Sequence, residues 1–156
     1  MKTADLSDQF PNLQYCEPIF KRYGANASFQ GRIRTVKCFE DNSKVKQVLS
    51  TPGDGSVLVV DAGGSERCAM LGDMIAAMAV ENNWSGVVMF GMIRDSADIN
   101  QMNLGVRALG TFPLKSQKED IGKVDVTVRF AGVTFNVGDY LYADEDGIIV
   151  SDQPLI

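Results

Sequence analysis

The chain has 156 residues, 45% of them hydrophobic, which is enough to bury a core of ordinary size and to form one domain over residues 1–156. Its 15 lysines and arginines against 20 aspartates and glutamates give a net charge of −5, which argues against nucleic acid or an anionic membrane as a direct partner. Histidine is absent, so a catalytic metal would have to be held by carboxylates and water, as magnesium or manganese is.

The three cysteines are widely and irregularly spaced and form no CxxC pair, which favours a reducing compartment. Residues 1–8 lack the apolar core of a signal peptide, and no apolar stretch reaches the roughly 18 residues that span a bilayer. We therefore expect a soluble, cytoplasmic protein.

The N-terminal third predicts a short helix followed by a half-buried strand. Polar and apolar residues nearly alternate over residues 27–39, as they do in a strand with one face in the core. Asp41 and Asn42 then predict the N-cap of a short helix that continues to about Leu49.

The central section predicts a parallel crossover unit. Residues 57–60 and 86–91 are continuous aliphatic runs, typical of strands buried on both faces. Between them, a helix ending near residues 82–83 is indicated by apolar residues at i, i+3, i+4 and i+7: Leu71, Met74, Ile75 and Met78. Strand, helix and strand in this order form a parallel pair joined by a helix.

The remainder predicts shorter elements. A helix is expected around residues 97–104 and a strand over 106–109. Hairpin-like turns then separate four short strands, at residues 125–130, 133–135, 140–142 and 148–150. The sequence thus predicts a layered α/β domain with a parallel centre and antiparallel C-terminal strands.

Three polar segments should meet at one edge of the central sheet. In a crossover unit the helix start and the carboxyl ends of both strands lie at the same edge, where open α/β sheets bind ligands. The segments are the loop 61–65, the helix opening Gly72, Asp73, Met74 and Ile75, and the pair Arg94 and Asp95.

These residues suit the chemistry of a 2-oxo acid. Backbone N–H groups at a helix start and a nearby arginine bind carboxylate or keto oxygens, and Asp95 offers a hard oxygen to a magnesium-type ion. Such an ion stabilises an enolate, while Asp73 could orient a metal-bound water that carries the proton. Alternatively, Asp73 merely favours the helix dipole and Arg94–Asp95 is an exposed turn pair.

Several stretches resemble the RraA family, named for a regulator of ribonuclease activity, which also contains the 4-hydroxy-4-methyl-2-oxoglutarate aldolases. The resemblance runs over nearly the whole chain. The stretches that carry it are residues 27–31, 35–42, 57–65, 141–144 and 147–149.

The aldolase branch of that family is marked by an aspartate, twenty intervening residues and then Arg-Asp, and Asp73 stands at that spacing before Arg94 and Asp95. The resemblance implies that Asp95 binds the divalent metal and that Arg94 binds substrate and steadies the enolate. It also implies that Asp73 positions a metal-bound water, and that the backbone from Gly72 to Ile75 receives the pyruvate carboxylate.

The same resemblance implies a swivelling β/β/α fold, a homotrimer with sites at subunit interfaces, and cleavage of 4-hydroxy-4-methyl-2-oxoglutarate into two pyruvates. Oxaloacetate decarboxylation would share the pyruvate enolate. Longer aldolases of the family carry a C-terminal glutamate that reaches the neighbouring subunit's metal shell. No residue before Ile156 matches it, so we expect a more open metal shell.

The main alternative is a non-catalytic regulator that binds and inhibits ribonuclease E, as the family's founding members do. Those regulators can lack the terminal aspartate of the motif, so Asp95 favours an enzyme. A methyltransferase, an activity once attached to the family's name, would need a cofactor loop. The sequence shows no convincing loop of that kind. The pair Gly63–Gly64 also does not form the GxGxxG fingerprint of a dinucleotide site and is more typical of a tight turn.

Overall fold

The structure is a computed structural model that describes residues 1–156, with four helices and eleven strands. The helices are α1 (Thr3–Gln9), α2 (Ser43–Leu49), α3 (Asp73–Glu81) and α4 (Ser96–Ile99). The strands are β1 (Gln14–Tyr15), β2 (Lys21–Tyr23), β3 (Phe29–Lys37), β4 (Val57–Asp61), β5 (Gly86–Ile93), β6 (Gly105–Thr111), β7 (Lys123–Val124), β8 (Val128–Phe130), β9 (Val133–Phe135), β10 (Tyr140–Asp144) and β11 (Gly147–Ser151).

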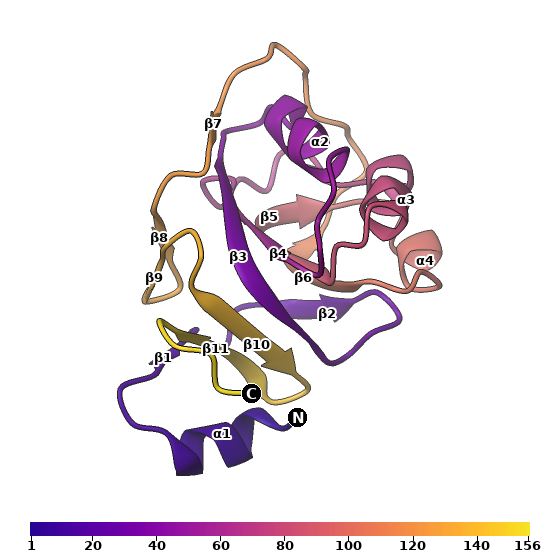
Figure 1. Ribbon diagram of the computed structural model, residues 1–156. Helices are drawn as coiled ribbons and strands as arrows, with labels where there is room; N and C mark the ends of the chain where they lie inside the picture. Colours follow the sequence, from indigo (N-terminus) through magenta and orange to yellow (C-terminus); the bar gives the residue numbers. More distant parts are fainter.

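The main sheet is mixed, with the strand order β1-β11-β10-β3-β4-β5-β6-β2 and β7 beside β3. Its centre is parallel, because β3, β4, β5 and β6 pair in the same direction, whereas β2, β10 and β11 are antiparallel to their neighbours. Figure 1 shows β3 as a long curved strand that connects the parallel centre to the β10–β11 hairpin.

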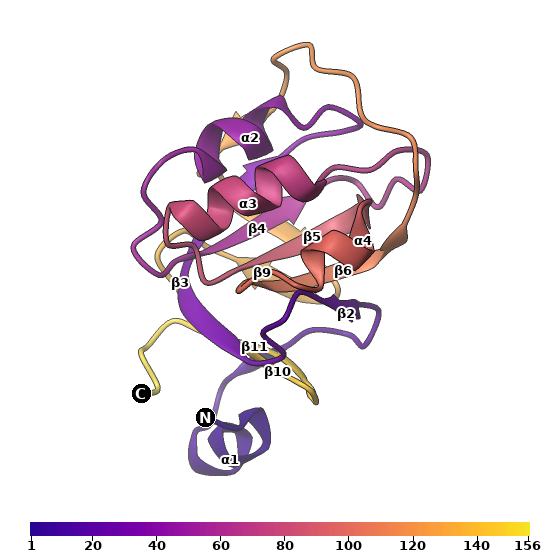
Figure 2. The ribbon, with the colours of Figure 1, turned by 90° about the vertical axis from the view of Figure 1, so that its right-hand side faces the viewer.

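The two faces of the parallel strands are buried by different elements. Along β4, Leu58 and Val60 face the core under α2 and α3, while Val57 and Val59 face a second core shared with the β8–β9 hairpin. Figure 2 shows α2 and α3 over one face of β4 and β5, with β9 behind the sheet. Burial on both faces explains why β4 and β5 are continuous apolar runs.

The crossover unit β4-α3-β5 confirms the predicted strands and helix, but the predicted apolar face of α3 is only partly right. Ile75, Ala76 and Ala79 are the residues that α3 buries, whereas Met74 is 79% exposed. The small side chains of Ala76 and Ala79 let α3 lie close to the sheet. They pack at positions where methionine was expected. The helix is therefore rotated about its axis relative to the prediction, and Met74 faces solvent near the start of the helix.

The expected fold class is confirmed, with adjustments at its edges. The helix predicted around residues 97–104 is a single turn at α4, and the first of the C-terminal strands begins only at Val128. Helix α1 packs on β10 and β11, where Leu6 contacts Tyr142 and Ile149. No helix in the chain combines the length and apolar character needed to cross a bilayer.

Candidate active site

The two halves of the Asp73…Arg94-Asp95 motif are joined by backbone pairing at the end of β5. Met70 N–H donates to Met92 O at 2.8 Å, and Arg94 N–H donates to Leu71 O at 2.9 Å. The segment before α3 therefore runs beside the last residues of β5. The β5–β6 register also shifts between Met89 and Met92, an irregularity of the kind that re-aims strand ends next to sites.

Asp95 lies where this pairing ends and holds the start of α3. Its Oδ2 accepts the N–H of Asp73 at 3.1 Å and lies 4.0 Å from Nε of Arg94. Asp95 has φ 55°, in the left-handed region that asparagine and aspartate tolerate better than most residues. A Cβ on Gly72 would stand 3.0 Å from Asp95 Oδ2, so the glycine permits the close approach.

Asp73 is the first residue of α3, and its carboxylate accepts the N–H of Met74 at 2.8 Å. The N–H groups of Asp73 and Met74 thus both donate to carboxylates of this chain. These two N–H groups are occupied by the chain itself, so it is the positive end of the helix dipole that still favours an anion at the start of α3. The side chain of Ile75 is buried, so this residue could contribute only its backbone to a ligand.

A cavity of about 240 Å³ opens at this point and contains all six residues predicted from the sequence. Its wall also includes Lys46 from α2 and Lys115 and Lys118 from the segment after β6. Together with Arg94, these lysines set four cationic side chains against the carboxylates of Asp73 and Asp95. The cavity is therefore locally positive in a protein whose net charge is −5.

Sequence reasoning did not find the lysines or Asn42, which also lines this cavity. They come from segments outside the crossover unit, and no spacing in the sequence connects them to Asp73 or Arg94. The loop 61–65, which was expected at the same edge, does not contribute to the cavity. Its Ser65 instead donates a hydrogen bond to Glu40 at 2.6 Å.

The oxygens at the cavity fit a magnesium-type ion better than a zinc-type one. No group of three or more His, Cys, Asp or Glu side chains converges anywhere in the chain. Magnesium commonly takes one or two carboxylates and completes its shell with water and substrate, which Asp73 and Asp95 could allow. Asn42 adds a buried Oδ1 that has no hydrogen-bond partner within the chain.

A larger hollow of about 860 Å³ shares Lys115 and Lys118 with this cavity. Two of its three acidic groups, Glu40 and Asp41, are already engaged by the chain itself. Hydrogen bonds from Arg67 and Ser65 lower the pKa of Glu40, and Asp41 is bonded to backbone N–H groups. We therefore place the candidate site in the smaller cavity, where the two carboxylates and Arg94 remain accessible.

Comparison with known proteins assigns the chain to a family. A family model described as RraA-like, Aldolase/RraA, matches residues 3–150. The chain belongs to the RraA-like family.

Two relatives of this RraA-like chain carry the name "Putative 4-hydroxy-4-methyl-2-oxoglutarate aldolase". The one from Laribacter hongkongensis is 54% identical, with 99% of this chain and 98% of the relative covered. The one from Azotobacter vinelandii is 56% identical, with 98% and 95% covered. The likeness therefore spans nearly the full length of both proteins.

Solved structures of the same fold carry other names. A protein from Geobacillus kaustophilus described as S-adenosylmethionine: 2-dimethylmenaquinone methyltransferase is 50% identical, with a TM-score of 0.95 and coverage of 99% of this chain and 97% of that one. The RNA-processing inhibitor RraA from Thermus thermophilis is 44% identical, with a TM-score of 0.96 and coverage of 99% and 94%. Both structures share the fold of this chain, whereas their names differ on activity.

The left-handed backbone of Asp95 predicts different stabilities for two variants of this RraA-like chain. Asp95→Ala should lower the free energy of unfolding by about 1–2 kcal/mol, because alanine is strained at positive φ and loses the bond from Asp73 N–H. Asp95→Asn should lower the free energy of unfolding by less, since asparagine tolerates this backbone conformation and its Oδ1 still accepts the hydrogen bond from Asp73 N–H. Urea unfolding in chelator-containing buffer measures both values. An equal loss in the two variants would contradict this account of Asp95.

Proposed function

We propose that this chain is a divalent-metal-dependent carbon–carbon lyase that cleaves 4-hydroxy-4-methyl-2-oxoglutarate into two pyruvates and also decarboxylates oxaloacetate. The observation that carries the proposal is the meeting of Asp73, Arg94 and Asp95 in one locally cationic cavity. The names of the aldolase relatives support it, as does the match of the motif spacing.

In the proposed site, Asp95 would supply the carboxylate oxygen that binds a magnesium or manganese ion, and Asp73 would orient a water beside it. Such an ion, when bound, acts as a Lewis acid that draws electron density from the 2-oxo group. The side chains of Arg94 and Asp95 are 39% and 36% exposed, so a small acid can reach both from solvent. The positive start of α3 favours the substrate's first carboxylate in the same cavity.

The reaction places negative charge next to Arg94. When the C3–C4 bond breaks, its electron pair forms the enolate of the first pyruvate, and the C4 hydroxyl loses its proton as it becomes the second pyruvate's ketone. The planar guanidinium of Arg94 can donate hydrogen bonds to the 2-oxo oxygen as that charge develops. Asp73 holds the water that accepts the hydroxyl proton and returns a proton to C3.

Oxaloacetate enters the same scheme by losing carbon dioxide. The C3–C4 bond again leaves its electron pair on C3, and protonation of the enolate from solvent gives one pyruvate. A common enolate means that both reactions need the same Arg94 contact. We therefore expect substitutions at this position to reduce both activities together.

A coupled pyruvate assay tests the proposal directly. With magnesium present, the wild type should release pyruvate from both acids, and chelator should abolish the release. Asp95→Asn and Arg94→Lys should each lower kcat by about 10²-fold or more, because the first removes a carboxylate and the second the planar fork. Asp8→Asn, an exposed change on α1, is the matched control and should keep the wild-type rate. Metal-independent release, or equal rates in all variants, would refute the proposed mechanism.

A second candidate function is regulation of ribonuclease E, favoured by the similarity to the RNA-processing inhibitor RraA. We propose it as an alternative in which the chain acts through protein contact and not through catalysis. Purified ribonuclease E should then be retained by the immobilised chain and should cleave RNA more slowly in its presence. Asp95→Asn should inhibit as well as the wild type, since this activity needs no metal ligand. Absence of both retention and inhibition would eliminate the alternative.

A further inference from the structure

A cationic wall formed by Lys115 and Lys118 lines the candidate cavity but has no task in the chemistry described so far. Neither lysine lies within 4.0 Å of a carboxylate of the chain, since the ion pairs present involve Arg34, Lys44, Arg67 and Arg94. Unpaired ammonium groups beside a cavity attract an anion from outside. The proposed substrates have a second carboxylate, remote from the 2-oxo group, that needs such a partner.

The backbone of the wall is joined to the site through Ala69. Ala69 N–H donates to Leu114 O at 2.7 Å, and Ala69 and Lys115 form a parallel bridge. On its other side Ala69 bridges to Met92, two residues before Arg94. One extended segment therefore connects the lysine wall with the end of β5, so the two are held at a fixed separation.

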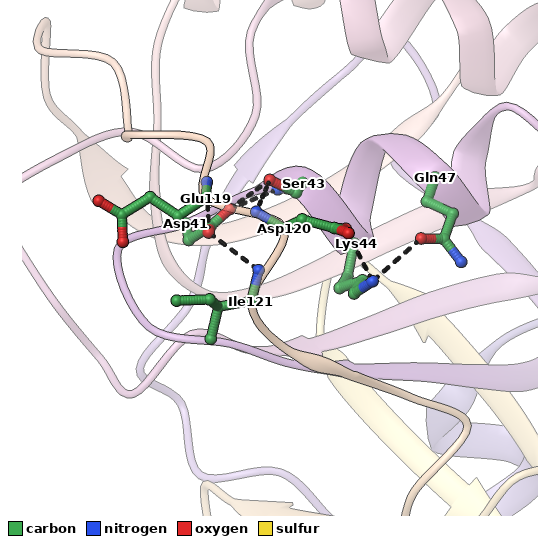
Figure 3. Close-up of polar contacts among 7 residues, drawn as sticks. All are labelled: Asp41, Ser43, Lys44, Gln47, Glu119, Asp120 and Ile121. Carbon is green, nitrogen blue, oxygen red and sulfur yellow. Dashed lines mark hydrogen bonds and ion pairs between the residues drawn. The ribbon is translucent and has the colours of Figure 1, made fainter.

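The residues that follow the wall are held by the carboxylate of Asp41. Its Oδ2 accepts the N–H groups of Glu119 at 2.8 Å and Ile121 at 3.2 Å. Its Oδ1 accepts the N–H and the hydroxyl of Ser43, at 2.9 and 2.6 Å. Figure 3 shows these contacts converging on Asp41 at the beginning of α2.

Further contacts join the same two segments. The Ser43 hydroxyl accepts the N–H of Asp120 at 3.1 Å, and Lys44 pairs with the Asp120 carboxylate at 2.8 Å (Figure 3). Closer to the cavity, Ser116 Oγ accepts the N–H of Asn42 at 3.2 Å. Residues 112–122 contain no helix or strand, so these contacts decide where the lysines lie.

Asp41 stays charged over the range in which the protein would work. Burial of the carboxylate raises its pKa, but the hydrogen bonds from Ser43, Glu119 and Ile121 outweigh burial and lower the pKa to about 2. Charge-assisted hydrogen bonds of this kind are stronger than neutral ones. The loop is consequently held at neutral pH by an ionised acceptor.

We propose that Lys115 and Lys118 bind the second carboxylate of the substrate, and that Asp41 is a positioning residue that holds these lysines at the cavity. The inference rests on the proposed function, because it assigns the remote end of the same substrate. It makes the site selective for 2-oxo acids with two carboxylates over those with one. Asp41 acts through the loop backbone and does not touch the substrate.

The test compares two acids of equal length that a retro-aldol reaction does not consume. Calorimetric titration in the presence of magnesium should show that 2-oxoglutarate binds the wild type at least about tenfold more tightly than 2-oxopentanoate, which has a methyl group in place of the second carboxylate. Lys115→Met and Lys118→Met should each remove most of this preference. Binding of 2-oxopentanoate should stay within about twofold. Lys2→Met, at the opposite end of the molecule beside α1, is the matched control and should retain the preference.

The Asp41→Asn variant tests the positioning role separately. This substitution should weaken the binding of 2-oxoglutarate by about tenfold and leave the binding of 2-oxopentanoate unchanged. A general structural defect would weaken the binding of both acids. The lysine variants decide the proposal even if Asp41→Asn fails to fold. Equal binding of the two acids by the wild type, or equal weakening of both in the lysine variants, would overturn it. If the wild type prefers 2-oxoglutarate to 2-oxopentanoate but releases no pyruvate from the proposed substrates, only the proposed lyase activity would be refuted.

Discussion

The pairing of residues 69–71 with the end of β5 is the interaction on which the candidate site depends. Asp73 and Arg94 are far apart in the chain, and a helix and a buried strand lie between them. Two backbone hydrogen bonds, from Met70 to Met92 and from Arg94 to Leu71, bring the start of α3 to the end of β5. Because these bonds lie on a rigid parallel sheet, Asp73, Arg94 and Asp95 do not depend on a mobile loop for their relative positions.

The charge of the candidate cavity is opposite in sign to the net charge of the chain. The chain carries a net charge of −5, yet its candidate cavity gathers Arg94 and three lysines around two carboxylates. The carboxylates are suited to a divalent ion and the cations to an anionic substrate, so the two sets are complementary and not redundant. Because the rest of the chain is net negative, this cavity is a local attractor for small anions.

The parallel centre and the three motif residues could be predicted from the sequence because each depends on local patterns. Buried strands appear as continuous aliphatic runs, and the sheet edge is common to all crossover units, so β4, α3 and β5 were found near their true bounds. The orientation of α3 about its axis was harder to predict. Ala76 and Ala79 pack where a larger methionine was expected, because apolar periodicity does not distinguish close packing by alanine from burial of Met74.

Contacts between segments that are distant in the sequence could not be predicted from local patterns. Lys115 and Lys118 lie in a stretch without periodicity, and bonds to other segments place them at the cavity, among them those of Asp41 to Glu119 and Ile121 and that of Ala69 to Leu114. The homotrimer, the cytoplasmic location and the metal remain predictions. The same holds for the chemical roles of Asp73, Arg94 and Asp95, whose positions alone are observed.

Exchange of the methyl protons of pyruvate with deuterium oxide, followed by proton NMR, tests the central claim most directly because it detects enolate formation without any carbon–carbon bond cleavage. The account predicts that the methyl signal declines in the presence of the wild-type protein and magnesium. The decline should slow by about 10²-fold or more in Arg94→Lys and Asp95→Asn. A methyl signal as stable with the wild-type protein and magnesium as in buffer alone would contradict the account.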